Sequence, residues 1–248
     1  KAINLEPDFA EAQNNLGNIL QQTGKMEEAT ASYAKAIYLK PGFAEAHLNL
    51  STNLSYMNAL DEEICAWKNL KQLDLDEYKL IAGVNIAICY FLKGDFLRSN
   101  RYLLEVEKFK DVGLLELQNA KVYKKYLLNI LNWHKRKYSK YSVHKNNKKL
   151  YVIGESHSLA AHQLTVKASD CYLLCAAKLI KGCMQWHLGH SEQNQYKNQI
   201  ECIFGSLPQS SEVLLTIGEI DCRLDSGIIQ HKKTAPKKEI EEIIITTV

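Results

Sequence analysis

Two short polar clusters in the second half of the chain contain residue types that could do chemistry. "GESH" (residues 154–157) ends one apolar run, and "GEIDCR" (residues 218–223) ends another. A serine hydroxyl becomes a nucleophile when a neighbouring base takes its proton, so Ser156 is a candidate nucleophile. The alternative is that Ser156 or Ser158 only caps a helix by accepting an amide hydrogen bond, with no catalysis.

The elements that must position these clusters are two short apolar runs, at residues 150–154 and 212–218, which are typical of strands. Helical patterns such as "QYKNQIECIFGSL" lie between them. Apolar strands that alternate with helices predict a parallel sheet in an α/β domain. The carboxyl ends of such strands meet at one edge of the sheet, where active sites gather. We therefore expect both polar clusters at that edge.

This half of the chain resembles the SGNH, or GDSL-type, hydrolases, which have a flavodoxin-like fold. The first block of that family is Gly-Asp-Ser, and its serine is the nucleophile. Here "GES" carries Glu155 in place of the aspartate and Ser156 as the nucleophile. The second block is a lone glycine, for which Gly182 is the nearest candidate. The resemblance implies that the backbone amides of Ser156 and Gly182 bind the developing oxyanion.

The third block of the family, Gly-x-Asn-Asp, is matched in part by "GEID". Gly218 and Asp221 match, but Ile220 stands where the oxyanion-binding asparagine is expected. Arg223 is the nearest side-chain donor that could replace this asparagine, and Asp221 could orient it. These two roles are hypotheses.

The catalytic base of the family comes from an Asp-x-x-His block, and none occurs between residues 223 and 248. We expect the base beyond residue 248, because residues 150–248 supply about half of such a domain. The alternatives within the chain are His157, His187 and His190. The last two also suggest a metal pair, but the other candidate ligands have no known metal-site spacing. The sequence predicts neither a metal nor an organic cofactor.

The first half of the chain contains an internal repeat. "KAINLEPDFAEA" at residue 1 returns as "KAIYLKPGFAEA" at residue 35, which gives a period of 34 residues. This pattern resembles the tetratricopeptide repeat, a hairpin of two helices. The best copy spans residues 10–42, a looser copy begins at residue 44, and a third surrounds Gly94. Small residues would let the two helices approach closely, and Gly24 can take the positive φ that ends the first helix.

Such repeats stack into a groove that usually holds peptides or protein partners. The first helix of each repeat lines the groove, and here those helices contain Asn14, Asn15, Asn18, Asn49 and Asn53. Asparagine both donates and accepts hydrogen bonds, so these side chains could clamp a peptide backbone. The alternative is that they are only solvated. The array is similar to the superhelix of the eukaryotic O-linked N-acetylglucosamine transferase, which also uses asparagine rows.

The predicted architecture is an α-helical repeat solenoid followed by part of a parallel α/β domain. Residues 1–133 are the repeats with a capping helix, residues 134–149 a basic linker, and residues 150–248 the N-terminal part of the α/β domain. We expect both ends of the chain to be cut from a longer protein.

The overall composition indicates which classes of partner and which cellular compartment to expect. The net charge of +3 is too small to indicate a nucleic-acid partner. No apolar run approaches the roughly 18 residues that cross a membrane. Seven cysteines without a disulfide-scaffold spacing favour a reducing compartment, so we expect a cytoplasmic protein.

The leading functional hypothesis is a serine esterase or acyl-transfer domain, carried on repeats that bind a protein or peptide. Its substrate would be an acylated carbohydrate or glycoconjugate, by analogy alone. One alternative is a non-catalytic interaction scaffold with a degenerate α/β domain. Another is a fragment of a repeat-containing, glycosyltransferase-like protein.

Overall fold

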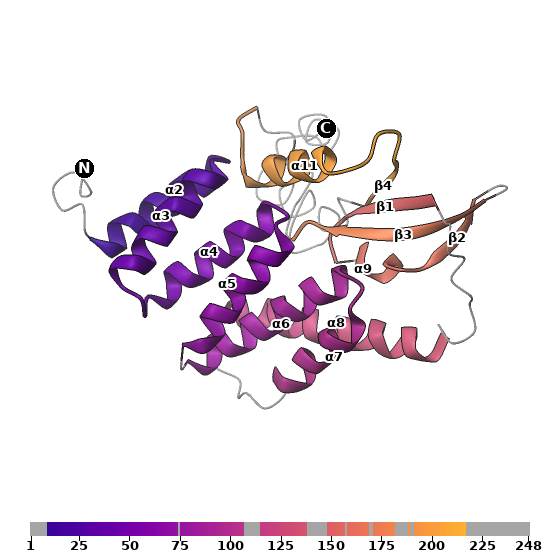
Figure 1. The fold of residues 1–248 in the computed structure, drawn as a ribbon, viewed down its shortest axis with the longest axis horizontal. Coiled ribbons are helices and arrows are strands. Elements are labelled where there is room, and N and C mark those ends of the chain that lie inside the picture. Colours follow the sequence, from indigo (N-terminus) through magenta and orange to yellow (C-terminus); the bar gives the residue numbers. More distant parts are fainter. Residues whose placement is uncertain are drawn as a thin grey trace, which may run out of the picture. The chain divides into compact units, whose positions relative to one another are not determined.

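The computed structural model forms two compact units, residues 1–144 and residues 145–248, and each is described by itself (Figure 1). The structure describes residues 9–73, 75–106, 115–137, 148–156, 158–168, 171–181, 188 and 191–216.

The first unit is entirely helical over its described residues. Each helix packs on the next one along the chain, and the last helix also packs on the helix two places before it (Figure 1). Its helices are α2 (Ala10–Gln22), α3 (Met26–Leu39), α4 (Ala44–Tyr56), α5 (Leu60–Gln72), α6 (Asp76–Leu92), α7 (Phe96–Glu105) and α8 (Leu115–Lys137). No helix in the described part of the chain is long and apolar enough to cross a membrane.

Three turns inside the helical hairpins have the same backbone geometry. Gly24, Asn58 and Gly94 have positive φ angles of 78°, 55° and 77°. The amide that follows each of them bonds to the carbonyl five residues earlier, as in Lys25 N to Leu20 O at 2.9 Å. This is the arrangement that ends a helix at a left-handed residue, and asparagine tolerates it better than most other residues. The predicted positive φ at Gly24 is confirmed.

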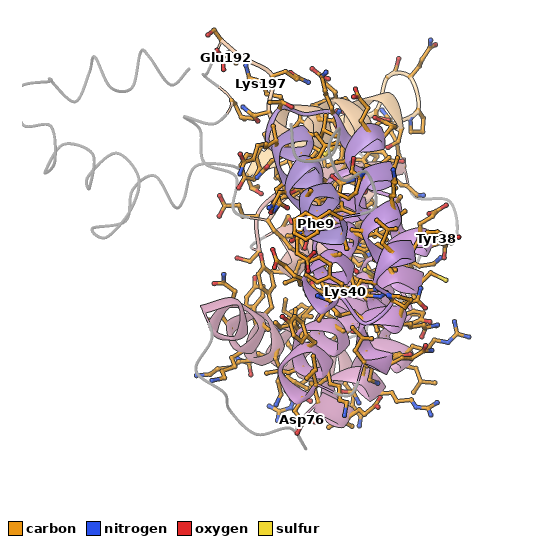
Figure 2. All side chains as sticks on the ribbon, turned by 90° about the vertical axis from the view of Figure 1, so that its left-hand side faces the viewer. Phe9, Tyr38, Lys40, Asp76, Glu192 and Lys197 are labelled. Carbon is orange, nitrogen blue, oxygen red and sulfur yellow. The ribbon has the colours of Figure 1, made fainter. Side chains whose placement is uncertain are left out.

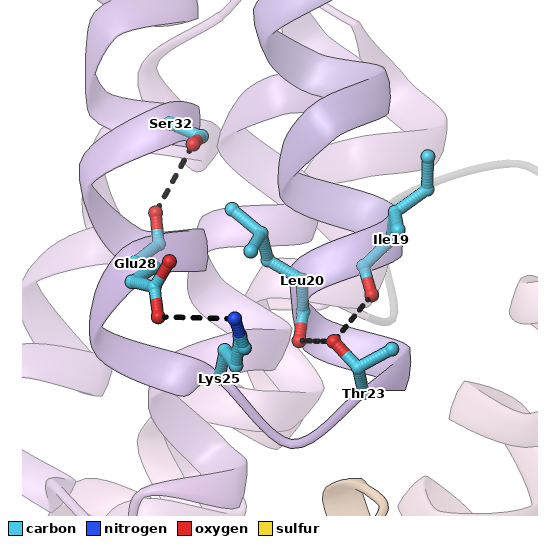
Figure 3. Close-up of polar contacts among 6 residues, drawn as sticks. All are labelled: Ile19, Leu20, Thr23, Lys25, Glu28 and Ser32. Atoms are coloured by element: carbon cyan, nitrogen blue, oxygen red, sulfur yellow. Dashed lines mark hydrogen bonds and ion pairs between the residues drawn. The ribbon is translucent and has the colours of Figure 1, made fainter.

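The turn between α2 and α3 is closed further by a side chain (Figure 3). The Thr23 hydroxyl lies 3.0 Å from both the Ile19 and the Leu20 carbonyl oxygens. It is a second donor to these carbonyls, which already accept the backbone amides of Thr23 and Lys25. On the other side of the turn, Lys25 pairs with Glu28 at 3.7 Å in the first turn of α3.

Small residues let the two helices of a hairpin approach closely, as expected. A Cβ added at Gly17 would lie 2.5 Å from Cε1 of the buried Tyr33 ring. Ala29 and Ala36 are fully buried. The close packing of α2 on α3 therefore depends on the absence of a side chain at Gly17.

An ion pair joins the two ends of the first hairpin. Lys40 Nζ lies 2.9 Å from Glu11 Oε1 and 4.9 Å from the centre of the Phe43 ring. Its hydrogen bond lowers the pKa of Glu11. Tyr38, two residues before Lys40, is 84% exposed and points away from the ribbon (Figure 2).

The second unit contains a small mixed sheet. Its elements are β1 (Lys148–Gly154), α9 (Ser158–Ala161), β2 (Thr165–Ala168), β3 (Cys171–Leu179), α11 (Gln195–Gly205) and β4 (Glu212–Thr216). The strand order is β2-β3-β1-β4, and β1 pairs parallel with β3 and with β4. The parallel relationship expected between the runs at residues 150–154 and 212–218 is confirmed.

The expected parallel sheet is mixed over the described strands, because one of its pairings is antiparallel. β2 runs antiparallel to β3, with Thr165 opposite Leu174. The two strands follow each other so closely along the chain that they can pair only as a hairpin, because a parallel crossover needs a dozen or more residues.

The sheet and α11 share an apolar core of Ile153, Ile180 and Ile203, all fully buried. Close approach of the strands explains the glycine of "GESH". A Cβ added at Gly154 would collide with Oγ1 of Thr216 on β4. Gly154 therefore allows β4 to lie against the end of β1.

Candidate functional site

Ser156 lies on the turn that directly follows β1, the strand with parallel neighbours on both sides. It is half-buried, and its backbone carbonyl accepts a bond from Leu159 N at 3.1 Å. Within the described residues its hydroxyl makes no hydrogen bond. The hydroxyl therefore has no capping bond in this part of the structure.

Ser158 has a structural place in the same turn. It is fully buried, and its hydroxyl donates to the Glu155 carbonyl oxygen at 2.7 Å. The Gly154 carbonyl oxygen lies 3.3 Å from the same hydroxyl. Both partners are carbonyl acceptors, so this hydroxyl binds back to the end of β1. Ser158 thus holds the turn that presents Ser156.

Two charged side chains also lie near this end of the sheet. Glu155, which replaces the expected aspartate, is buried. Lys178 pairs with Ile153 across β1 and β3, and burial lowers its pKa, with a smaller contribution from Lys149. The end of β3 is tied to its neighbours, since Ile180 N donates to Gly154 O at 2.7 Å. The bond between Ile180 and Gly154 holds the ends of β3 and β1 together, directly before the turn that carries Ser156.

His162 was not singled out by the sequence analysis, and the structure gives it a definite role. It is buried, and its Nδ1 accepts a hydrogen bond from Ala177 N of β3 at 3.0 Å. A nitrogen that accepts an amide hydrogen carries none itself, so Nε2 is protonated in the neutral ring. His162 thereby fastens the segment after α9 to β3.

The other predicted catalytic residues, Gly182, Asp221 and Arg223, lie outside the described residues. So do the alternative bases, His157, His187 and His190. Their roles remain predictions. No group of metal-ligating side chains occurs among the residues that the structure does describe.

The five predicted groove asparagines differ in how deeply their side chains are buried. Asn14 and Asn53 are buried, Asn18 and Asn49 are half-buried, and Asn15 is exposed.

Asn49 joins α4 to α2. Its Nδ2 lies 3.0 Å from Oδ1 of both Asn14 and Asn18. Asn14 in turn donates to Glu45 Oε1 at 3.0 Å, and the Tyr33 hydroxyl donates to Asn18 Oδ1 at 2.8 Å. This chain of hydrogen bonds fixes the side-chain amide of Asn49.

Asn53 points in another direction, toward α3. Its Nδ2 donates to Met26 O and Thr30 Oγ1, each at 2.8 Å. Burial and these bonds give Asn53 a packing role between α4 and α3. Asn15 makes no hydrogen bond within the part of the chain that the structure describes.

A sixth asparagine, Asn85 on α6, was missed by the sequence analysis. It lies nine residues before Gly94, as Asn15 does before Gly24 and Asn49 before Asn58. Alignment of the repeats on their turn residues would have found it, because the third repeat departs from the 34-residue period before the turn.

Comparison with known proteins agrees with this helical arrangement. A family model described as the tetratricopeptide repeat matches residues 10–43, which are α2, α3 and the turns beside them. No curated protein matches the chain. The chain therefore carries a tetratricopeptide repeat, and α4 to α7 continue it as further helical hairpins with the same turn geometry.

Proposed function

We propose that the helical unit is a protein-interaction scaffold that binds an extended segment of a partner along α2, α4 and α6. One observation carries the proposal: Asn15, Asn49 and Asn85 occupy the same position, nine residues before a positive-φ turn, in three consecutive hairpins. Tetratricopeptide repeats commonly bind proteins or peptides, which supports this reading.

The recurring asparagines suit a peptide backbone. An extended segment offers one N–H donor and one C=O acceptor per residue, and a side-chain amide can pair with both. Because such contacts do not depend on the partner's side chains, a row of them would bind many sequences in one backbone conformation.

Asn49 is the best-prepared member of this row. Its Nδ2 is held by Asn14 and Asn18, so its side chain is ordered before a ligand arrives. Its Oδ1 accepts no hydrogen bond from any described residue and could accept one from a peptide N–H. Binding would then cost less side-chain entropy than at a mobile residue.

The test is selection of peptides from a random display library on the whole chain, followed by affinity measurement by fluorescence anisotropy. Asn15→Ala should lower the affinity for the selected peptides by about fivefold, which corresponds to the loss of one net hydrogen bond. Asn69→Ala is the matched control, because Asn69 is an exposed asparagine on α5, the second helix of its hairpin. Equal losses in both variants, or no selected peptide, would overturn the proposal.

A second candidate function belongs to the other unit: hydrolysis or transfer of an acyl group by Ser156, with an acylated glycoconjugate as the substrate. The supporting observation is that Ser156 directly follows the central parallel strand. Its hydroxyl makes no hydrogen bond to any residue that the structure describes. The Gly182 amide and Arg223 keep their proposed roles in oxyanion binding, and Asp221 keeps its proposed role of orienting Arg223. The reaction is proposed on the sequence resemblance together with this placement.

Its test is turnover of p-nitrophenyl acetate by the protein, beside Ser156→Ala and Ser191→Ala. Ser191 is exposed in a loop, so its variant controls for general acyl acceptance by surface serines. Loss of turnover in Ser156→Ala alone would support the activity. Equal rates in all three proteins would leave the scaffold as the function.

We also propose a cytoplasmic location. No disulfide involves the cysteines that the structure describes, which are Cys65, Cys89, Cys171, Cys175 and Cys202. Free thiols are typical of a reducing compartment.

A further inference from the structure

We infer that the peptide bound by the asparagine row carries one lysine or arginine, whose side chain pairs with Glu45 on α4. The inference rests on the proposed function of the helical unit and specifies the chemistry of its partner. Three observations carry it. The carboxylate lies on the same side of α4 as Asn49, a buried amide fixes its position, and it forms no ion pair with any described residue.

Glu45 and Asn49 are neighbours on the surface of α4. They are four residues apart in one helix, so their Cβ atoms lie about 5 to 6 Å apart on one face. Glu45 is exposed and Asn49 is half-buried. A peptide backbone that pairs with the Asn49 side chain would therefore pass close to the carboxylate. The flexible stem of a lysine or arginine can span this separation.

Asn14 on α2 holds these two side chains in one arrangement. Its own side chain is buried, with 1% exposed. Asn14 Nδ2 donates to Glu45 Oε1 at 3.0 Å, and Asn14 Oδ1 accepts from Asn49 Nδ2 at 3.0 Å. The two bonds use opposite ends of one amide, so they fix Glu45 and Asn49 relative to each other. A carboxylate that is ordered before binding loses less side-chain entropy when it pairs.

The equivalent glutamate one repeat earlier has a cation beside it, whereas Glu45 has none within the described residues. Glu11 lies 34 residues before Glu45 and pairs with Lys40 at 2.9 Å. The residue 34 positions after Lys40 is Asp74, so the sequence supplies no cation at the corresponding position. The negative charge of Glu45 also raises the pKa of Tyr33, for which burial is the larger cause. The partner of the asparagine row would supply the missing cation.

The repeats predict one basic residue in the peptide and not a basic run. The position thirteen residues before the positive-φ turn is Glu11 in α2, Glu45 in α4 and Ile81 in α6. Glu11 is already paired, and Ile81 is buried and apolar. The preference should therefore appear at a single peptide position, the one beside Asn49.

The test compares two selections from a random peptide display library, one on the unmodified whole chain and one on Glu45→Gln. Glutamine keeps a side-chain oxygen that can accept from Asn14 and removes only the charge, so the hairpins should fold in both proteins. Peptides selected on the unmodified chain should share a lysine or arginine at one aligned position. Peptides selected on Glu45→Gln should lack this preference.

Fluorescence anisotropy then compares one selected, fluorescein-labelled peptide with its variant that has glutamine at the shared basic position. This change should lower the affinity for the unmodified chain by about threefold to fivefold, as one exposed charge pair contributes. It should leave the affinity for Glu45→Gln unchanged, and the difference should shrink as salt is added.

Glu62→Gln is the matched control. Glu62 is an exposed glutamate in the first turn of α5, as Glu45 is in the first turn of α4, so both interact with a helix N-terminus. The loss on removing the basic residue of the peptide should be the same for Glu62→Gln as for the unmodified chain. A purely structural role of Glu45 would not produce a loss that depends on the peptide side chain.

The outcomes separate this inference from the proposed function. Asn15→Ala should weaken both labelled peptides by the same factor, because its backbone contacts do not depend on the basic side chain. If Asn15→Ala weakens the peptides but the glutamine change acts equally on the unmodified chain and on Glu45→Gln, the Glu45 inference is overturned and the scaffold stands. Selection of no peptide by the unmodified chain would overturn both.

Discussion

The Asn49 amide on α4 donates to the Asn14 side-chain oxygen on α2 at 3.0 Å, across the boundary between two helical hairpins. The same nitrogen lies 3.0 Å from Asn18 Oδ1, so one side chain contacts two successive turns of α2. Hydrogen bonds between equivalent helices fix how one repeat is placed on the next. The asparagines thus contribute to the scaffold itself as well as to the proposed peptide surface.

Replacement of Asn49 by alanine should therefore destabilise the helical unit. Loss of its amide leaves the partly buried oxygen of Asn14 without this donor, which costs about 1 to 3 kcal/mol. Asn69→Ala, on the exposed face of α5, should change stability by less than about 0.5 kcal/mol. Urea unfolding followed by circular dichroism measures both values, and equal midpoints would show that the bridge carries no stability.

Gly17→Ala should destabilise the first hairpin through overpacking. The added methyl group would lie 2.5 Å from the buried Tyr33 ring, which can move only by separating α2 from α3. Such overpacking costs about 1 to 3 kcal/mol. Gly42→Ala is the control, because nothing lies within 4 Å of a Cβ at that position. Thermal unfolding of both variants should show a lowered midpoint for Gly17→Ala alone.

His134 should make the stability of the helical unit depend on pH. The imidazole is buried on α8, with ring centres 5.1 Å from Phe96 and 5.4 Å from Trp133, and burial lowers its pKa. A lowered pKa means that the folded protein binds the proton less readily than the unfolded chain. This contribution is complete above the ordinary value of 6.5 and is lost as the pH falls below it, through the pKa of the folded state.

The measurement is the free energy of unfolding from mildly alkaline to mildly acidic pH, for the unmodified chain and for His134→Phe. Phenylalanine keeps a flat ring beside Phe91 and Phe96 and cannot titrate. The difference between the two proteins should grow as the pH is lowered. A constant difference would show that His134 does not titrate in this range.

Gly154→Ala should separate β4 from β1 at the end that carries Ser156. The added methyl group would collide with the Thr216 side chain and its backbone carbonyl, and backbone cannot move aside as a flexible side chain can. Hydrogen exchange of the β4 amides should become faster, whereas Gly205→Ala, with open space around its Cβ, should leave exchange unchanged. Unchanged exchange in Gly154→Ala would show that the strand contact adapts.

Much of the helical unit could be predicted from the chain alone. The 34-residue period, the small residues and the turn at Gly24 are local patterns, and similar patterns recur from one repeat to the next. The strands at residues 150–154 and 212–218 were also visible as apolar runs between turn signals. β2 and β3 were not, because Lys167 and Lys178 interrupt their apolar character and only pairing with neighbouring strands stabilises them.

The sequence by itself determined which residue types recur and at what spacing, because helix turns and repeat periods depend on neighbours along the chain. The tertiary structure decided which side chains are available. Asn14 and Asn15 are adjacent, yet Asn14 is buried against Glu45 and Asn15 is exposed, because successive residues point about 100° apart around a helix. The cations beside Tyr90 come from α5 and α7, so only the packing of separate helices brings them to one surface.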